Sequence, residues 1–275
     1  MTATKPTVGS AEKWGPLWGA RARDWAEVEE QQLPTYEEAI RRVGVTRGQR
    51  VLDIGCGTGR LLRPLSSLGW RVVGMEPHPD YVAMSRLVAA EAPGTIEVVA
   101  GGFGDLEAVS QFDLVLAVGD PWWYLLTPED RADALARSYR ALRPGGVIFL
   151  DGPNFHWILD HYRPPVPSEV RYGEVLIRRS PQHEIDRAGR VWTHIDTFTA
   201  PETGETVSTV HRFAMISVDE ITGALEAAGL GEVKTYASWH ARTPGLPEGP
   251  RIMVAARRGS STVGSGSTEH ARTVS

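Results

Sequence analysis

The sequence predicts an α/β protein built on a doubly wound, mostly parallel sheet of seven strands, and three observations lead to this prediction. Short apolar runs alternate with amphipathic segments of helical length over residues 49–153. The first of these runs, Val51–Ile54, stops directly before a glycine-rich turn. Residues 154–214 then lose the alternation and show β character broken only by turns, which indicates an antiparallel β insertion after the fifth strand.

The chain is expected to divide into five segments. Residues 1–48 are predicted to form a helical cap, 49–153 a ligand-binding core, and 154–214 an acceptor-binding lid made of the β insertion. Residues 215–258 return to the core with a helix that begins at a capping signal and with the last two strands. Residues 259–275 are mainly Ser, Thr and Gly, a composition typical of disordered tails.

Composition excludes several classes of function. The net charge of -5 argues against a nucleic-acid partner, because phosphate binding depends on clusters of Lys and Arg. No apolar run approaches the roughly 20 residues of a membrane span, and Met1–Lys5 lacks the apolar core of a secretory signal. The only cysteine, Cys56, excludes a disulfide framework and a multi-Cys metal site. We therefore expect a cytoplasmic protein without a metal, and leave a homodimer open.

A strand, a tight turn and a helix start follow one another over Val51–Arg60. Glycine at Gly55, Gly57 and Gly59 allows positive φ and close backbone approach, so the N–H groups at the helix start can face a ligand. A dinucleotide site of the G-x-G-x-x-G type needs a glycine where Arg60 stands. A phosphate loop of the G-x-x-x-x-G-K-[ST] type needs a lysine that is absent. The pattern that remains is D-x-G-x-G-x-G.

The second, third and fourth strands add further candidate residues where they end. Residues 71–75 end at Glu76, and an acid at this position can accept the ribose hydroxyls of an adenosyl group. Residues 96–99 lead to the stretch Gly101–Leu106. The near-continuous apolar run 112–118 is typical of a strand that is buried on both faces. The helix that follows this strand is predicted to begin at Thr127, an N-cap residue followed by proline.

These features, together with an L-x-P-G-G turn at Leu142–Gly146, resemble the class I S-adenosylmethionine (SAM)-dependent methyltransferases over Gln49–Asp151. The resemblance implies a Rossmann-like fold, SAM as cofactor and S-adenosylhomocysteine as product. Gly102 stands where the family often has an acid at the adenine, so that contact is either absent or shifted to Asp105. The implied cofactor residues are Trp18, Arg23, Asp53, Gly55, Cys56, Gly57, Gly59, Glu76, Pro77, Gly102, Phe103 and Val118.

The stretch Trp18–Trp25 pairs aromatic residues with two arginines ahead of the glycine turn. It resembles the N-terminal helix that many actinobacterial small-molecule methyltransferases place over the cofactor. On that resemblance Arg23 pairs with the methionine carboxylate of SAM in a bidentate contact. A salt bridge on the protein surface is the alternative.

Asp120-Pro121-Trp122-Trp123 follows the fourth strand, where an acceptor should meet the methyl group. It is similar to the [DN]-P-P-[YW] signature of enzymes that methylate amines on nucleic acids, but its second proline is replaced and the chain is acidic. We expect Asp120 to hold the acceptor within aromatic walls. Core packing of both tryptophans is the alternative. The expected substrate-binding residues are Trp122, Trp123, Tyr124 and Trp157.

Four histidines in or beside the insertion offer a general base, because imidazole titrates near neutral pH. They are His156, His161, His194 and His211. His156, directly after the fifth strand, is the first choice as catalytic base and His211 the second, with Asp120 the third catalytic candidate. No H-E-x-x-H pattern is present, so a metal site is not expected. Cys56 is interpreted as a small residue that fits the turn and not as a nucleophile.

The function predicted from the sequence is methyl transfer from SAM to an N or O atom of a small molecule, a bacterial natural product. Methyl transfer is an in-line displacement at an already activated centre, so orientation of the reactants can supply most of the catalysis. The insertion and the ending Gly249–Arg258 resemble bacterial enzymes that methylate amino sugars and other small metabolites. A SAM-dependent reaction without methylation, such as cyclisation, and a non-catalytic SAM-binding partner protein are the alternatives.

Overall fold

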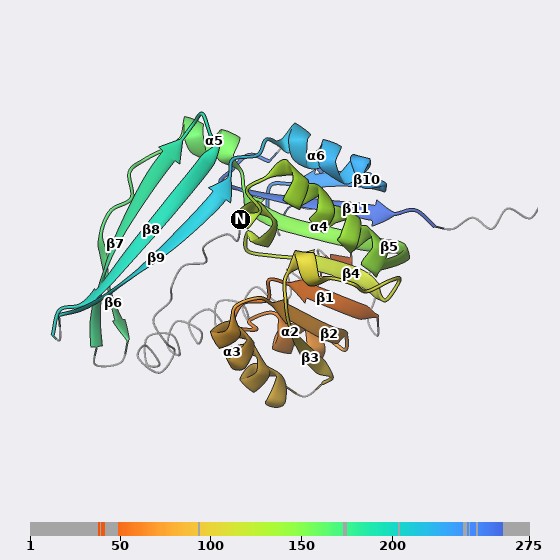
Figure 1. Cartoon of the computed structure of the whole chain (residues 1–275), viewed down its shortest axis with the longest axis horizontal. Helices are drawn as coiled ribbons and strands as arrows, with labels where there is room; N and C mark the ends of the chain where they lie inside the picture. The colour runs from red at the N-terminus through yellow and green to blue at the C-terminus, as the bar shows by residue number, and fades with distance from the viewer. Residues whose placement is uncertain are drawn as a thin grey trace, which may run out of the picture.

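The computed structural model describes residues 38, 40, 41, 49–92, 94–172, 175–202, 204–238, 241, 243–245 and 247–260, which form two β-sheets (Figure 1). The main sheet has seven strands in the order β10-β11-β5-β4-β1-β2-β3, and β11 is the one strand of this sheet whose direction is opposite to that of the other six. This confirms the predicted fold class. The strands are β1 (Arg50–Ile54), β2 (Arg71–Glu76), β3 (Ile96–Ala100), β4 (Phe112–Ala117), β5 (Leu142–Pro153), β10 (Leu230–Tyr236) and β11 (Arg251–Arg258).

Two hydrophobic clusters cover the two faces of the main sheet. Side chains alternate between the faces of a strand, so Val115 and Ala117 of β4 join one cluster while Leu114 and Leu116 join the other. None of the described helices is long and apolar enough to cross a membrane. The helices are α2 (Leu62–Ser67), α3 (Pro79–Ala90), α4 (Pro128–Ala141), α5 (Phe155–Asp160) and α6 (Val218–Ala227), with short 3-10 turns η1 (Phe103–Asp105) and η2 (Pro121–Tyr124).

Both predicted helix starts are present. The Thr127 side chain accepts a hydrogen bond from the backbone N–H of Asp130, and α4 begins at the proline that follows Thr127. At α6, Ser217 and Glu220 form a reciprocal capping box. These caps satisfy N–H groups that a helix leaves without partners, so the sequence marks the two starts locally.

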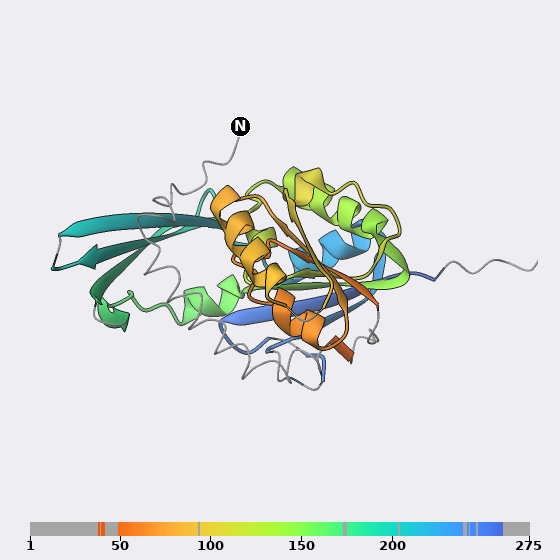
Figure 2. The ribbon, with the colours of Figure 1, turned by 90° about the horizontal axis from the view of Figure 1, so that it is seen from below.

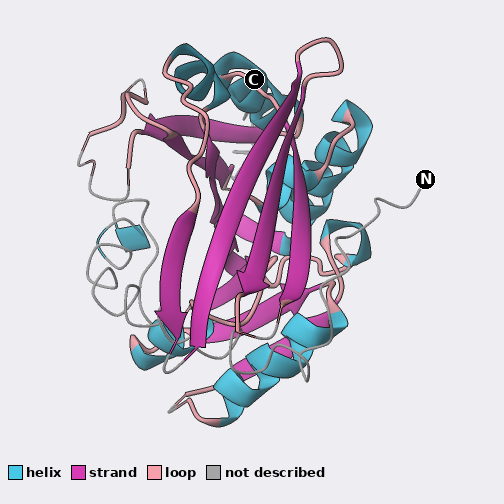
Figure 3. Cartoon of the chain, turned by 90° about the vertical axis from the view of Figure 1, so that its left-hand side faces the viewer, coloured by secondary structure: helices cyan, strands magenta, loops and turns pink. Residues whose placement is uncertain are grey.

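The insertion forms a second, four-stranded antiparallel sheet that extends away from the main sheet (Figures 2 and 3). Its strands are β6 (Ser168–Tyr172), β7 (Val175–Asp186), β8 (Val191–Ala200) and β9 (Glu205–Ala214). The sequence predicted neither β6 nor the second half of β7, which contains Pro181. Proline is tolerated there because β6 pairs with β7 only as far as Arg179, so β7 is an edge strand beyond that residue.

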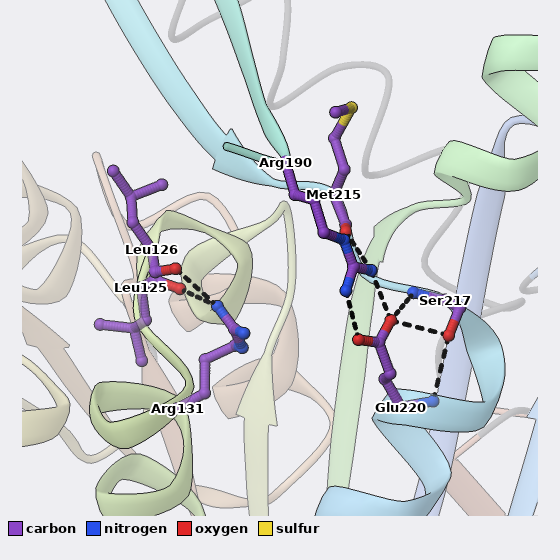
Figure 4. A network of polar contacts seen from close by, with 7 residues as sticks. All are labelled: Leu125, Leu126, Arg131, Arg190, Met215, Ser217 and Glu220. Atoms are coloured by element: carbon purple, nitrogen blue, oxygen red, sulfur yellow. Dashed lines mark hydrogen bonds and ion pairs between the residues drawn. The ribbon is translucent and has the colours of Figure 1, made fainter. Parts of the chain in front are cut away.

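The tip of the β7–β8 hairpin is tied to α6 by Arg190 (Figure 4). Arg190 donates to both carboxylate oxygens of Glu220 and to the carbonyl oxygen of Met215, at 2.7 Å. Its guanidinium, together with the capping bonds of Ser217, holds the pKa of Glu220 at about 2. The insertion is therefore anchored to the C-terminal part of the core at this end.

Candidate active site

The glycine turn after β1 has the backbone that its sequence requires. Gly55, Gly57 and Gly59 have φ values of +74°, +57° and +90°, a region that favours glycine. A Cβ on Gly55 would lie 2.7 Å from Pro121, and one on Gly59 would lie 3.0 Å from Ser85. Among the residues that the structure describes, none would come within 4 Å of a Cβ on Gly57. Packing thus requires the outer two glycines, whereas the described part of the chain leaves space beside Gly57 in which a ligand can lie.

Glu76, at the end of β2, is fixed against this turn. Its Oε2 accepts the backbone N–H of Gly57 at 3.0 Å, and its Oε1 accepts that of His78 at 2.8 Å. Although the residue is only 6% exposed, its carboxylate stands at the edge of the turn. The residue predicted to hold the ribose and the turn predicted to hold the cofactor therefore form one unit.

The stretch predicted at the adenine has its own internal hydrogen bond. Asp105 accepts the backbone N–H of Gly102 through Oδ2 at 2.8 Å, so its carboxylate stabilises the loop. Gly102 faces Pro77, since a Cβ there would lie 3.8 Å from that ring. Phe103 is 6% exposed and belongs to the hydrophobic core. The structure brings Gly102 and Pro77 together and directs Phe103 into the core.

The remaining cofactor candidates are buried or lie outside the described residues. Asp53, Cys56 and Val118 are 2%, 4% and 5% exposed. Burial, with the Asp53 and Glu76 carboxylates nearby, raises the pKa of the Cys56 thiol, so the thiol stays protonated and is a poor nucleophile. Trp18 and Arg23 lie outside the part of the chain that the structure describes, and their predicted contacts with SAM remain predictions.

Asp120 has a positive φ of +77° at the tip of β4 and is paired with an arginine. Arg251 on β11 donates to Asp120 Oδ1 at 2.6 Å and to Asp151 Oδ1 at 2.8 Å. The backbone N–H of Asp120 also donates to the carbonyl oxygen of Asp151 at 3.0 Å. Sequence reasoning missed Arg251, which is 131 positions from Asp120, although an arginine at the start of an apolar strand was a signal.

The two tryptophans of the motif are core residues. Trp122 and Trp123 are both 0% exposed, and their rings pack edge to face at 5.4 Å. The indole N–H of Trp122 donates to the carbonyl oxygen of Arg131 at 3.3 Å, and the ring of Trp123 packs against Gly152. This corrects the expectation that they wall the acceptor site, because both rings turn inward from η2. Tyr124 is the exposed aromatic residue of this turn, at 38%.

The candidate bases lie in different surroundings. His156 and half-buried Trp157 are on α5, where the His156 side chain is 83% exposed and faces Asp160 at 3.8 Å. His211 lies on β9, and its Nδ1 is 2.7 Å from the hydroxyl oxygen of Tyr124. The geometry therefore favours His211, the second choice from the sequence, over His156.

Tyr124 links the two halves of the site. It belongs to η2, directly after the strand that ends beside the glycine turn, while its partner His211 belongs to the insertion. Burial of the hydroxyl raises the pKa of Tyr124, and so do the charges of Asp120 and Glu76. Tyr124 thus stays protonated at neutral pH, and its hydroxyl can donate to Nδ1 of His211 whenever that nitrogen carries no proton.

Comparisons with known proteins agree with this geometry. Residues 51–146 match the family described as "Methyltransferase domain". A ubiquinone biosynthesis O-methyltransferase of Bradyrhizobium diazoefficiens is 31% identical over 122 residues, which cover 44% of this chain and 47% of that protein. The chain thus matches about half the length of such curated relatives.

Solved structures match over a longer range. The CcbJ methyltransferase of Streptomyces caelestis superposes with a TM-score of 0.68 at 21% identity, covering 82% of this chain and 90% of that one. The SAM-bound amino pentose methyltransferase CalS10 of Micromonospora echinaspora gives a TM-score of 0.65 at 24% identity, covering 89% and 96%. At these identities the likeness concerns the fold, and it includes the part of the chain beyond the family match.

Proposed function

We propose that this protein transfers a methyl group from SAM to a small molecule, because residues 51–146 match the family described as "Methyltransferase domain" and carry the glycine turn that resembles class I enzymes, whose cofactor is SAM. The methyl group goes to an N or O atom, and the acceptor is a bacterial natural product. The turn fits the cofactor, since Gly57 faces open space beside the buried carboxylate of Glu76.

The observation that carries the proposal is the contact between Tyr124 and His211 at 2.7 Å. It joins the end of β4, where ligands bind in open α/β sheets, to the face of the second sheet. An acceptor bound between the end of β4 and the second sheet would have Tyr124 on one side and the glycine turn, which would hold the cofactor, on the other. Such a site holds a small molecule and not a polymer, in keeping with the net charge of -5.

In this mechanism the bound cofactor supplies an activated methyl group, and the chain supplies positioning. Gly57 and Glu76, which are joined by the hydrogen bond from the Gly57 N–H to Glu76 Oε2, would hold the adenosyl end of the cofactor. Asp120, fixed by Arg251, sets the start of η2 and hence the place of Tyr124. Orientation of two reactants in this way can account for about 7–11 kcal/mol of the barrier.

The names of the relatives support the acceptor class. Ubiquinone biosynthesis enzymes of several bacteria are named O-methyltransferases, and CalS10 is named an amino pentose methyltransferase. Both kinds of acceptor are small molecules with a hydroxyl or amino group. We therefore propose this class for the present chain without choosing between oxygen and nitrogen.

The test has two stages. Calorimetry should first show binding of SAM and of S-adenosylhomocysteine. The protein is then incubated with methyl-labelled SAM and a panel of catechols, sugar alcohols and amino sugars, and labelled products are identified by mass spectrometry. Labelled product with equimolar S-adenosylhomocysteine supports the proposal. Conversion of an acceptor without S-adenosylhomocysteine would instead indicate a non-methylating reaction, and no binding of either ligand would refute the cofactor site.

A further inference from the structure

We propose that Tyr124 and His211 act as one proton-accepting unit that removes the acceptor's proton. This inference rests on the proposed function and names the acid–base pair of that site. The hydroxyl oxygen of Tyr124 takes the proton of the acceptor while the Tyr124 proton passes to Nδ1 of His211.

The geometry of the pair suits such a transfer. The two atoms are 2.7 Å apart, within the usual range for proton transfer between heavy atoms. Phe213, two residues further along β9, holds both rings: its centroid is 4.7 Å from that of Tyr124 and 6.3 Å from that of His211. The 38% exposure of Tyr124 leaves a surface for an acceptor.

The direction of proton transfer within the pair follows from the chemistry of the two side chains. A tyrosine with a raised pKa does not persist as tyrosinate, so Tyr124 cannot by itself store the proton. The imidazole of a histidine can store the proton, because imidazole titrates near neutral pH. With Tyr124 donating to Nδ1, neutral His211 carries its own proton on Nε2 and is ready to accept a second one.

The neighbouring histidines of the second sheet are engaged with each other. His183, His194 and His211 lie directly opposite one another on β7, β8 and β9. His194 donates through Nε2 to Asp196 at 2.8 Å, and its Nδ1 is 2.7 Å from Nε2 of His183. Arg179 in turn binds Asp196 at 2.6 Å.

His211 lies 6.3 Å from His194 between ring centroids, but it differs from the other two histidines in its hydrogen-bond partner outside the insertion, Tyr124. Burial and the adjacent His194 lower the pKa of His183, which therefore stays neutral. Both ring nitrogens of His194 are directed at partners within the insertion. Among the described residues no group of three or more His, Cys, Asp or Glu side chains is placed to hold a metal ion. His211 is thus the member of the row that contacts the cofactor half of the site.

Proton and electron counts balance for a hydroxyl acceptor. The oxygen lone pair forms the new O–C bond, the methyl–sulfur bond breaks with its electrons left on sulfur, and the acceptor O–H proton moves to Tyr124. The Tyr124 proton moves to His211, and the imidazolium returns it to solvent before the next turnover. An amine acceptor differs only in that an N–H bond is broken.

Two substitutions separate the two roles. Tyr124→Phe removes the proton carrier, whereas His211→Asn keeps an oxygen that accepts from Tyr124 but cannot take a proton. Each should lower kcat on the acceptor found by the labelled screen by about 10²–10⁴-fold, the usual contribution of general base catalysis. Affinity for S-adenosylhomocysteine should stay within twofold. The double variant should be no slower than the slower single variant, because the residues act as a unit.

Arg212→Gln is the matched control, since Arg212 neighbours His211 in sequence but points to the other face of β9 and is exposed. The wild-type rate should fall as His211 is protonated at low pH, and His211→Asn should abolish that dependence. The titratable and charged groups described around His211 include Tyr124 on η2 and His194 on β8, with Asp196 and Arg179 behind. Wild-type turnover and pH profile in His211→Asn would overturn the inference while leaving the methyltransferase proposal intact.

A second measurement needs no acceptor. The ring protons of His211 are titrated by NMR with S-adenosylhomocysteine present. Neutral imidazole accepts the hydrogen bond of Tyr124 whereas imidazolium would donate to the same oxygen, and the two bonds differ in strength, so Tyr124→Phe should shift the His211 titration. Arg212→Gln should leave it unchanged. An unchanged His211 pKa in Tyr124→Phe would show that the two residues do not interact, which also overturns the inference.

Discussion

The guanidinium of Arg60 lies against Gly119, with Nη2 only 2.6 Å from where a Cβ on Gly119 would stand. Arg60 occupies the position at which a dinucleotide-binding turn has its third glycine, and here that side chain reaches the end of β4. Pro121 packs on Gly55 in the same way, because its ring carbons lie 2.7 Å from where a Cβ on Gly55 would stand. The glycine turn after β1 and the turn between β4 and η2 therefore interlock.

Gly119→Ala should destabilise the protein for two reasons. Gly119 has φ of +78°, which costs an L-residue about 1–2 kcal/mol, and the new Cβ would clash with Arg60. Urea unfolding should show a loss within this range or slightly above it, because the guanidinium is the far end of a flexible side chain and can move aside. In a double-mutant cycle with Arg60→Ala, the steric part alone should appear as coupling between the two substitutions. Strict additivity of the two losses would mean that Arg60 does not occupy this space.

Gly57→Val should abolish SAM binding while the protein stays folded. The side chain would enter the space before the turn, where no atom of the described residues lies within 4 Å of its Cβ. Gly69→Val is the matched control, because Gly69 also has a positive φ, +88°, and open space around its Cβ, but lies between α2 and β2. Both should lose similar stability, and calorimetry should find that only the first loses SAM. Unchanged SAM affinity in Gly57→Val would refute the cofactor site.

Glu76→Gln should weaken SAM binding about tenfold or more. A carboxylate that accepts backbone N–H groups and ribose hydroxyls contributes roughly 1.5–3 kcal/mol per charged hydrogen bond, and 1.4 kcal/mol is tenfold in affinity. The exposed acid Glu107 provides the control substitution, Glu107→Gln, for the loss of one negative charge. Equal SAM affinities for the two variants, measured by calorimetry, would place the ribose elsewhere.

Arg251→Met should destabilise the fold by about 2 kcal/mol at pH 7, as judged from urea unfolding. It leaves Asp120 and the buried Asp151 without their cation. The loss falls below the roughly 3–5 kcal/mol of a fully buried pair because the Arg251 side chain is 38% exposed. Arg257→Met, on the same strand, removes a pair with the exposed Glu232 and should cost less. A larger loss of stability in Arg257→Met than in Arg251→Met would contradict the role of Arg251 as the cation that stabilises Asp120 and Asp151.

Glu220 should make stability depend on pH in the acid range. Its pKa in the folded protein, about 2, lies below the ordinary value of 4.5, so ionised Glu220 stabilises the fold above pH 4.5. This contribution is lost as the pH falls from about 4.5 towards 2. The melting temperature of Glu220→Gln should therefore vary less with pH over this window than that of the wild type. Glu226→Gln, an exposed acid on the same helix, should keep the wild-type dependence.

The parts of the fold that the sequence predicted are those with local causes. The glycine turn, the acid at the end of β2 and the two helix caps depend on residues within a few positions of each other. Hydrophobic alternation likewise marks the seven strands of the main sheet. Fold class and cofactor therefore followed from short stretches.

The contacts that define the acceptor side are distant in sequence. Tyr124 and His211 are 87 positions apart, and their meeting depends on where the second sheet docks. Proximity in sequence to β5 favoured His156, but α5 turns that side chain outward. Likewise the inward turn of Trp122 and Trp123 follows from the 3-10 geometry of η2, which residue type alone does not reveal.

The strict alternation along β7, β8 and β9 limits how the lid can change. His183, His194 and His211 share one face, and each flanking residue lies on the other. A one-residue insertion within a strand, if not absorbed by a bulge, would exchange the faces beyond it and carry His211 away from Tyr124. If the second sheet binds the acceptor as proposed, its specificity is changed with least disturbance by point substitutions on the histidine face, or by insertions of two residues at a time.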